Sequence, residues 1–348
     1  MNESTIFVCL THSKASSYQT KKGVRIMRSA MDIFTLSSRI AALVVVGIAL
    51  MSGPAPAQQA GQPTLGLFDA ARESLFGDVY AEPSKWQPLS AGTFFSEGWN
   101  RPWASPPPGE GGAPRQGWLN AFDGVFYRLG VLTGGLANDY SDTNRNQYTA
   151  GLTLYTPFSA RFELRYDIPF IASNREVSGG DYHTSFGDLQ ITPRFLISES
   201  SNFTQSLNVT VRMPTGSEHN GNGFGAVTPD WEFWWNPWSK FVLRGGVGFL
   251  VPYSDRDNVQ DAFIANFAVG YYFTPHDFTP LGDLVFYLSA NLKQPISGSG
   301  SKDTVVTLTP GLRTHLGANW YLLGGVEVPV TSPKAFDFQV LAGLMKVF

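Results

Sequence analysis

The clearest pattern in this sequence is an alternation of apolar and polar side chains with a period of two. The best example is the stretch Arg161–Phe170, where every second residue from Arg161 to Asp167 is charged and the residues between them are apolar or aromatic. Successive side chains of a β-strand point to opposite faces, so this stretch predicts a strand with one charged and one apolar face. The same alternation recurs in Asp188–Ile197, Ser206–Met213 and Leu284–Lys293.

Alternation of this kind predicts an all-β fold of about twelve antiparallel strands. The lengths of the alternating segments suit tilted membrane strands, which need about 9–11 residues. The predicted strands are 122–133, 147–156, 161–171, 186–197, 204–213, 227–235, 241–251, 261–273, 282–292, 304–316, 320–330 and 336–348. Long polar connections alternate with mostly shorter ones. Long external loops and short periplasmic turns are typical of bacterial outer-membrane barrels. An even strand count also places both termini on the periplasmic side.

Aromatic residues cluster at several predicted strand ends, where they predict an aromatic belt at the membrane interface. The clusters are Trp231, Trp234, Trp235 and Trp238; Tyr271, Tyr272 and Phe273; and Trp320 with Tyr321. The last strand carries apolar residues on one face and ends in Phe348, which resembles the assembly signal that barrel assembly machinery reads. That face comprises Phe336, Phe338, Val340, Ala342 and Leu344, and Lys346 breaks the alternation beside it.

Residues 1–57 have the three parts of a secretory signal peptide. Basic residues precede the apolar run Ile40–Met51, and Ala55-Pro-Ala57 follows as a cleavage site. The run is too short for an ordinary spanning helix of about 20 residues. The chain's one cysteine, Cys9, lies in this segment, so the mature protein is expected to contain no disulfide. Export and strand number together favour an outer-membrane barrel over a soluble sandwich or lipocalin-like barrel, which period two alone would also fit.

Residues 58–120 lack a periodic apolar face long enough for a core of their own. Leu65–Phe76 predicts one short amphipathic helix, and the proline- and glycine-rich run 105–114 predicts a loop. We therefore expect a mostly irregular extension, periplasmic or folded into the barrel mouth like a plug, followed by a barrel domain from residue 121 to 348.

Several short strings, in this order, resemble the barrels grouped as the meta-pathway phenol-degradation family. They are Thr156-Pro-Phe158, Glu163-Leu-Arg-Tyr-Asp-Ile-Pro169, Gly187-Asp-Leu-Gln-Ile-Thr-Pro-Arg194 and Arg212-Met-Pro-Thr-Gly216. The resemblance covers residues 122–348. It implies a porin-like barrel in the outer membrane of a Gram-negative bacterium, with outer-membrane lipid and a small hydrophobic or aromatic solute as partners. No catalytic residues come with the family.

Eleven charged residues in the predicted strands are candidates to line the lumen, since a charge within a spanning segment must face a wet or paired interior. They are Glu163, Arg165, Asp167, Asp188, Arg194, Arg212, Asp230, Glu232, Arg244, Arg313 and Glu327. Their signs are mixed, which leaves two interpretations open. They line a narrow polar path for solutes, or they pair across strands and close a structural or surface-interaction barrel without transport.

Other chemistry receives little support. The whole chain has a formal net charge of −3, which does not indicate a nucleic-acid partner. An outer-membrane hydrolase would need a nucleophile beside a base, but His183, His219 and His276 fall in connections and His315 at a strand end. Loop residues such as Asp255-Arg-Asp257 could bind calcium, although solvated loop polarity explains them as well. We expect no enzyme activity, cofactor or metal site.

Overall fold

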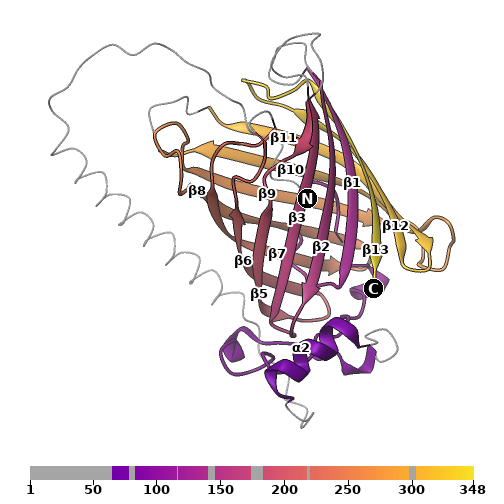
Figure 1. The fold of residues 1–348 in the computed structure, drawn as a ribbon. Helices are drawn as coiled ribbons and strands as arrows, with labels where there is room; N and C mark the ends of the chain where they lie inside the picture. Colours follow the sequence, from indigo (N-terminus) through magenta and orange to yellow (C-terminus); the bar gives the residue numbers. More distant parts are fainter. Residues whose placement is uncertain are drawn as a thin grey trace, which may run out of the picture.

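The computed structural model describes residues 65–77, 83–115, 117–139, 146–173, 183–217, 220–297 and 303–348. The predicted signal segment 1–57 lies outside these residues. The described strands form one antiparallel sheet in which strands consecutive in the sequence pair with each other. Pairing of β1 with β13 and of β2 with β3 closes the sheet into a barrel (Figure 1).

The barrel has twelve strand positions, as the alternation predicts, and eleven of the predicted strands match observed strands within a few residues. One position is shared by β4 and β5, which both pair with β3 and are separated by residues 187–189. The strands are β1 Leu129–Asn138, β2 Gln147–Pro157, β3 Phe162–Ser173, β4 His183–Phe186, β5 Gln190–Glu199, β6 Phe203–Arg212, β7 Ala226–Trp238, β8 Phe241–Pro252, β9 Ala262–Tyr272, β10 Gly282–Pro295, β11 Val305–Gly317, β12 Trp320–Pro329 and β13 Phe338–Val347.

The outer wall of the barrel is apolar and the inner wall is polar and charged. Leu132, Phe267 and Phe286 each expose more than half of their surface on the outside. Glu163 and Arg313, which face the interior, are completely buried. A soluble barrel would bury its apolar face and expose its polar one. The observed inversion means that the outer wall faces lipid, and the soluble alternative is excluded.

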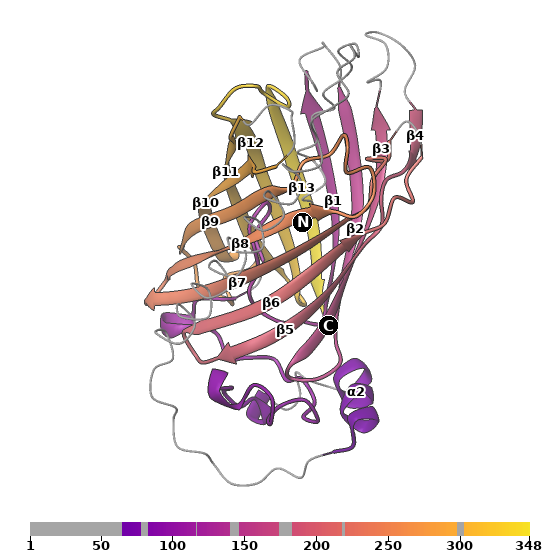
Figure 2. The same cartoon turned by 90° about the vertical axis from the view of Figure 1, so that its left-hand side faces the viewer.

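The two ends of the barrel differ in the lengths of the connections between strands. Turns such as 158–161, 200–202, 239–240 and 318–319 close one end, where the β9–β10 connection 273–281 is longer, and the described connections 253–261 and 330–337 lie at the other end (Figures 1 and 2). This asymmetry confirms the predicted alternation. In an outer-membrane barrel the short-turn end faces the periplasm.

The aromatic belt is only partly as predicted, because adjacent residues in a strand face opposite sides. Trp235 and Trp238 are exposed on the outside, but Trp234 is completely buried inside the barrel. The last strand behaves as expected over most of its length, since Phe338, Val340, Leu344 and Phe348 are exposed. Phe336, however, is buried. Lys346 Nζ donates to the Ala318 carbonyl at 2.6 Å, which keeps its charge at the rim.

The first strand begins later than predicted. β1 starts at Leu129, whereas the predicted strand spans 122–133. Residues 122–128 belong instead to a loop inside the barrel, which contains no regular structure. Val125, Phe126 and Tyr127 are three consecutive apolar or aromatic residues, and this composition resembles that of a strand. All three are buried in the structure, so they do not alternate between two faces.

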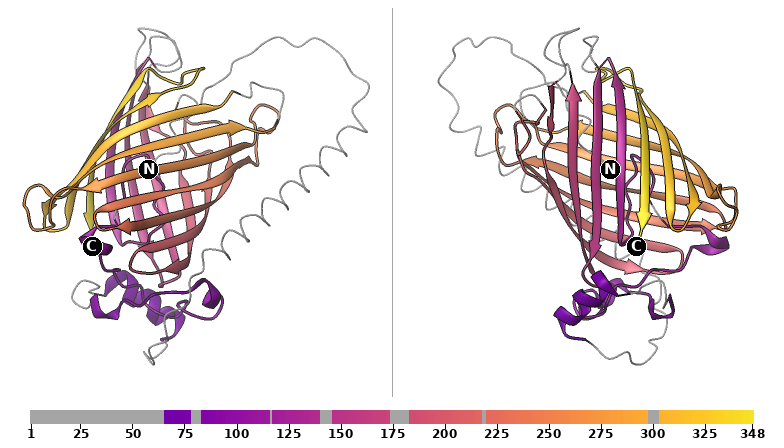
Figure 3. Two further views of the ribbon diagram at one scale, coloured as in Figure 1. Left: turned by 180° about the vertical axis from the view of Figure 1, so that it is seen from behind. Right: turned by 45° about the vertical axis from the view of Figure 1, so that its right-hand side comes forward.

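Residues 65–77 and 83–112 of the N-terminal extension lie at the short-turn end (Figures 1 and 3). They contain α2 Leu67–Phe76, which confirms the predicted helix, and the short 3-10 turns η2 Pro83–Lys85, η3 Ala91–Thr93 and η4 Glu110–Gly112. Among the described residues, no helix is both long and apolar enough to span a membrane.

Two arginines fix this extension to the barrel. Arg161, in the β2–β3 turn, donates to the Ser90 and Glu97 carbonyls at 2.9 Å each. Burial lowers the pKa of Arg161 to about 10, which still leaves it charged at neutral pH. Arg128 donates to the carbonyls of Leu75 and Gly77 at 3.0 and 2.9 Å, and so holds the end of α2 beside the start of β1.

Candidate functional site

The interior of the barrel holds a loop, described at residues 113–115 and 117–128, that we call the lumenal loop. It enters from the short-turn end, where Tyr272 Oη donates to the Pro114 carbonyl at 3.0 Å. At mid-depth, the Asn120 side chain donates to Glu327 Oε2 at 2.8 Å. The chain then returns to the short-turn end and enters β1 at Leu129. The loop therefore occupies part of the cross-section through which a solute would have to pass.

The reversal of the chain requires backbone conformations that most residues avoid. Asn120 and Gly124 both have a φ of 52°, in the left-handed region. A Cβ at Gly124 would lie 2.6 Å from the backbone carbon of Phe233 on β7. Glycine is therefore required at position 124 for close approach to the barrel wall as well as for its φ. The sequence Asn-Ala-Phe-Asp-Gly, residues 120–124, was the available signal of a turn at this point.

Three of the predicted lumen residues form an ionic cluster that anchors the returning half of the loop. Arg194 on β5 pairs with Glu163 on β3 and, at 3.3 Å, with Glu232 on β7. Backbone groups of the loop complete the cluster. The Gly124 N–H donates to Glu232 at 2.8 Å, the Tyr127 N–H donates to Glu163 at 2.9 Å, and Arg194 donates to the Val125 carbonyl at 3.0 Å. The Glu163 and Glu232 carboxylates therefore bind both Arg194 of the barrel wall and the backbone of the lumenal loop.

Arg244 on β8 anchors the other side of the loop. Its guanidinium pairs with the Asp123 carboxylate and donates to the Asp123 carbonyl at 3.0 Å. The same guanidinium lies 5.0 Å from the ring centroid of Trp118, in a cation–π arrangement. Trp118 stacks on Tyr287 of β10, with ring centroids 4.9 Å apart and an interplanar angle of 7°. One arginine thus holds two points of the loop.

Further contacts hold the apex and the entry of the loop. At the apex, the Asn120 carbonyl accepts from Asn266 at 3.1 Å and from Asn291 at 3.2 Å. At the entry, Arg115 donates to Glu199 at 3.2 Å and lies over the Trp234 ring at 4.7 Å. Burial lowers the pKa of Arg115, and the charge of Glu199 partly offsets that effect.

The remaining predicted lumen residues are also turned inward, and ten of the eleven candidates are buried. Arg165, the eleventh, keeps 12% of its side chain exposed and pairs with Asp167 at 2.8 Å. Glu327 accepts from Thr307 at 2.6 Å. The other four are dispersed: Asp188 accepts from the Gly216 and Asn222 N–H groups, Asp230 from Asn208, and Arg212 and Arg313 lie over the rings of Phe224 and of Tyr272 and Tyr321.

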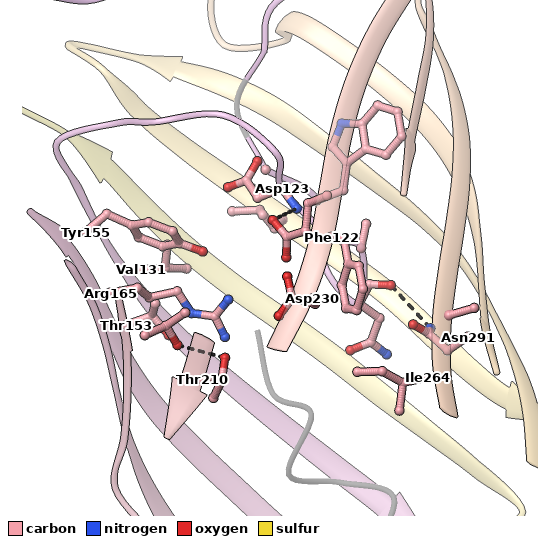
Figure 4. A pocket seen from close by; sticks show the side chains of 18 of the residues that line it. Phe122, Asp123, Val131, Thr153, Tyr155, Arg165, Thr210, Asp230, Ile264 and Asn291 are labelled. Carbon is pink, nitrogen blue, oxygen red and sulfur yellow. Dashed lines mark hydrogen bonds between the residues drawn. The ribbon is translucent and has the colours of Figure 1, made fainter. Parts of the chain in front are cut away.

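A cavity of about 100 Å³ runs alongside the lumenal loop (Figure 4). Its lining reaches from Leu250 and Ile264, near the long-loop ends of their strands, to Leu129 and Met345, near the short-turn end. The wall along β1, β12 and β13 is apolar except for Glu327, and its apolar residues are Leu129, Val131, Leu323 and Met345. Polar side chains lie on other parts of the lining and include Thr153, Arg165, Thr210, Asp230, Asn291 and Lys293. The cavity also borders the ionic anchors, since Asp123 and Glu232 belong to its lining.

Most of the barrel wall around this site matches the model of a recognised sequence family. The family model described as "Putative MetA-pathway of phenol degradation" matches residues 130–337, which is more than half of the chain. A search of curated protein sequences found no match. The match begins at β1 and therefore leaves the lumenal loop and the N-terminal extension outside it.

Solved structures share the architecture at low sequence identity. The COG4313 outer membrane channel from Pseudomonas putida F1 is 16% identical with a TM-score of 0.50, and the match covers 64% of this chain and 96% of that one. A protein described as the KdgM porin is 11% identical with a TM-score of 0.45, covering 63% and 99%. The CymD monoaromatic hydrocarbon channel is 8% identical with a TM-score of 0.38, covering 69% and 96%. The first of these supports the fold, and the barrel is located in the outer membrane.

Proposed function

The chain belongs to the family described as "Putative MetA-pathway of phenol degradation", and we propose that it conducts small apolar or aromatic solutes across the outer membrane. The observation that carries this proposal is the cavity beside the lumenal loop, which reaches from the long-loop half of the barrel to its short-turn end. The proposed activity is passage through a channel and not catalysis.

The size of the cavity supports a small solute. Its volume is about 100 Å³, and an apolar cavity of roughly 150 Å³ is large enough to hold benzene. A single aromatic ring is therefore of the right order after a slight movement of the walls, whereas an oligosaccharide is far too large. We infer that the lumenal loop acts as a constriction that restricts passage by size.

The lining supports a solute with one polar group. Val131, Leu323 and Met345 provide an apolar wall, on which a ring is desolvated at little cost. Thr153 and Thr210 present hydroxyl groups to the same cavity, and Arg165 presents a guanidinium. A phenol or an aromatic carboxylate would place its ring against the apolar wall and its oxygen toward the hydroxyl groups and the guanidinium.

Ion current through a planar bilayer tests both parts of the proposal. The refolded chain is expected to give small single-channel currents, since the loop narrows the lumen. Addition of a small aromatic such as phenol or benzoate is expected to interrupt the current, and an equal concentration of a disaccharide is not. Silence from a protein shown to be folded would favour the closed structural barrel, in which the eleven charged residues serve only cross-strand pairing and loop anchoring.

A further inference from the structure

Three side chains with metal-ligating atoms meet at the short-turn rim of the barrel. His276 lies in the β9–β10 turn, Asp283 near the start of β10 and His315 near the end of β11. Pairing of Gly282 with His315 brings the two strand ends together. One nitrogen from each histidine and one carboxylate oxygen lie within 4.8 Å of one another. Their positions in the sequence form no metal-binding motif, so only the fold reveals the group.

Two members of this group are held firmly by the rim. Asp283 exposes 3% of its surface, has a φ of 49° and forms a hydrogen bond with His276 Nδ1 at 2.6 Å. His315 exposes 6% of its surface, and its Nδ1 lies 3.2 Å from the His276 carbonyl oxygen. A non-glycine residue in the left-handed region is uncommon and often marks a functional constraint.

His315 also has a buried nitrogen that the described residues do not satisfy. Its Nε2 has no hydrogen-bond partner among them, although the side chain is enclosed in the wall. A buried polar atom left without a hydrogen bond is unfavourable, so the position calls for a ligand or a solvent molecule. This observation is independent of the proximity of the three side chains.

Coordination of an ion would require the His276 ring to move from its present position. The rings of His276 and His315 are stacked, with centroids 4.2 Å apart and an interplanar angle of 12°. Lone pairs of parallel rings lie side by side and do not converge on one ion. The His276 side chain is 60% exposed, so it has room to turn once its hydrogen bond to Asp283 is exchanged for an ion, whereas His315 is confined by burial and by the Tyr321 ring, whose centroid is 4.9 Å away. Two fixed ligands and one mobile ligand thus make up the group.

We propose that His276, Asp283 and His315 bind a divalent transition-metal ion such as Zn²⁺. Two imidazole nitrogens and one carboxylate oxygen, with water in a fourth position, form an ordinary donor set for zinc. Calcium and magnesium prefer oxygen ligands and do not suit two histidines. The bound ion would join the β9–β10 turn to β11, and its binding to the folded chain alone would stabilise the rim.

The composition of the chain makes a direct binding experiment decisive. It has five histidines and one cysteine, and Cys9 and His12 lie in the predicted signal peptide. His183 and His219 are then the other histidines of the mature protein. Isothermal titration calorimetry of the refolded barrel with zinc chloride is expected to show one saturable site per chain. His276→Ala is expected to weaken binding by at least about tenfold, and His183→Ala, at an exposed position in β4, is expected to have no effect.

A second variant and a spectroscopic probe separate coordination from a general effect on folding. Asp283→Asn keeps the shape of the side chain and removes its charge, so it is expected to weaken zinc binding while the circular dichroism of the barrel stays unchanged. Cobalt(II) in the same site is expected to give visible absorption bands that His276→Ala abolishes. Absence of saturable binding, or equal affinities in the wild type and His276→Ala, would overturn the proposal.

Discussion

Replacement of Arg244 by methionine is expected to release the lumenal loop and widen the channel. The Arg244 side chain is completely buried and Asp123 exposes 9% of its side chain, so the substitution leaves a carboxylate without its cation in the interior. Loss of one partner from a buried pair costs about 3–5 kcal/mol. The segment around Asp123 can relieve part of this cost by moving away from the wall, because it is not part of the strand pairing.

An energy of this size shifts the docking equilibrium of the loop strongly. Each 1.4 kcal/mol corresponds to about a tenfold change in an equilibrium constant, so 3 kcal/mol shifts the equilibrium toward the detached loop on the order of a hundred-fold relative to the wild type. The substitution also removes the cation–π contact with Trp118, which is worth about 0.5–2 kcal/mol. We therefore expect larger single-channel conductance and faster proteolytic cleavage within residues 113–128.

A double variant serves as the matched control for this experiment. Arg244→Met with Asp123→Leu removes both charges, and replacement of a buried pair by apolar side chains is often neutral. The double variant is expected to regain much of the small conductance of the wild type. The reasoning is refuted if Arg244→Met, shown to be folded, conducts like the wild type, or if the double variant is as open as the single one.

Three further substitutions test the route, the loop and the anchors. Leu323→Trp fills the cavity and is expected to lower both conductance and current block, whereas Leu322→Trp, which faces lipid, leaves both unchanged in the same bilayer recordings. Gly124→Ala is expected to destabilise the protein in urea by more than the roughly 1 kcal/mol of Gly112→Ala, since both have positive φ but only the first meets backbone; equal losses would contradict this. Arg194→Met is expected to cost about 3–5 kcal/mol in the same assay, and a loss below 1 kcal/mol would show that the cluster is not a buried ion pair.

Period two and the lengths of the connections were enough to predict the barrel and nearly all of its strands. Both signals are local: a strand that separates lipid from a polar interior must alternate along its own length. Arg161–Phe170 illustrates this, since its residues from 162 onward form β3 with Glu163 and Asp167 buried inside. Ten of the eleven charged candidates that this rule predicts to line the lumen are buried in the structure. Whether any of them contacts a solute stays a prediction.

The lumenal loop could not be predicted because its partners are distant in sequence. Gly124 and Glu232 are 108 residues apart, and Asn120 and Glu327 are 207 apart. Without these partners, residues 122–128 look like the start of a strand. The assignment of four tryptophans to one interface failed for a simpler reason, since Trp234 and Trp235 are neighbours and must face opposite sides. The signal peptide, and recognition of Phe348 by barrel assembly machinery, stay predictions.

Uptake through an intact outer membrane tests the central claim most directly. Cells that lack other porins for aromatic compounds would be supplied with this chain or with its Leu323→Trp variant, and entry of a radiolabelled aromatic carboxylate would be measured. The proposed channel predicts faster uptake with the wild-type chain and a return toward the background rate with the variant. Uptake at the background rate with a wild-type barrel shown to be folded in the outer membrane would contradict the channel and favour a closed barrel.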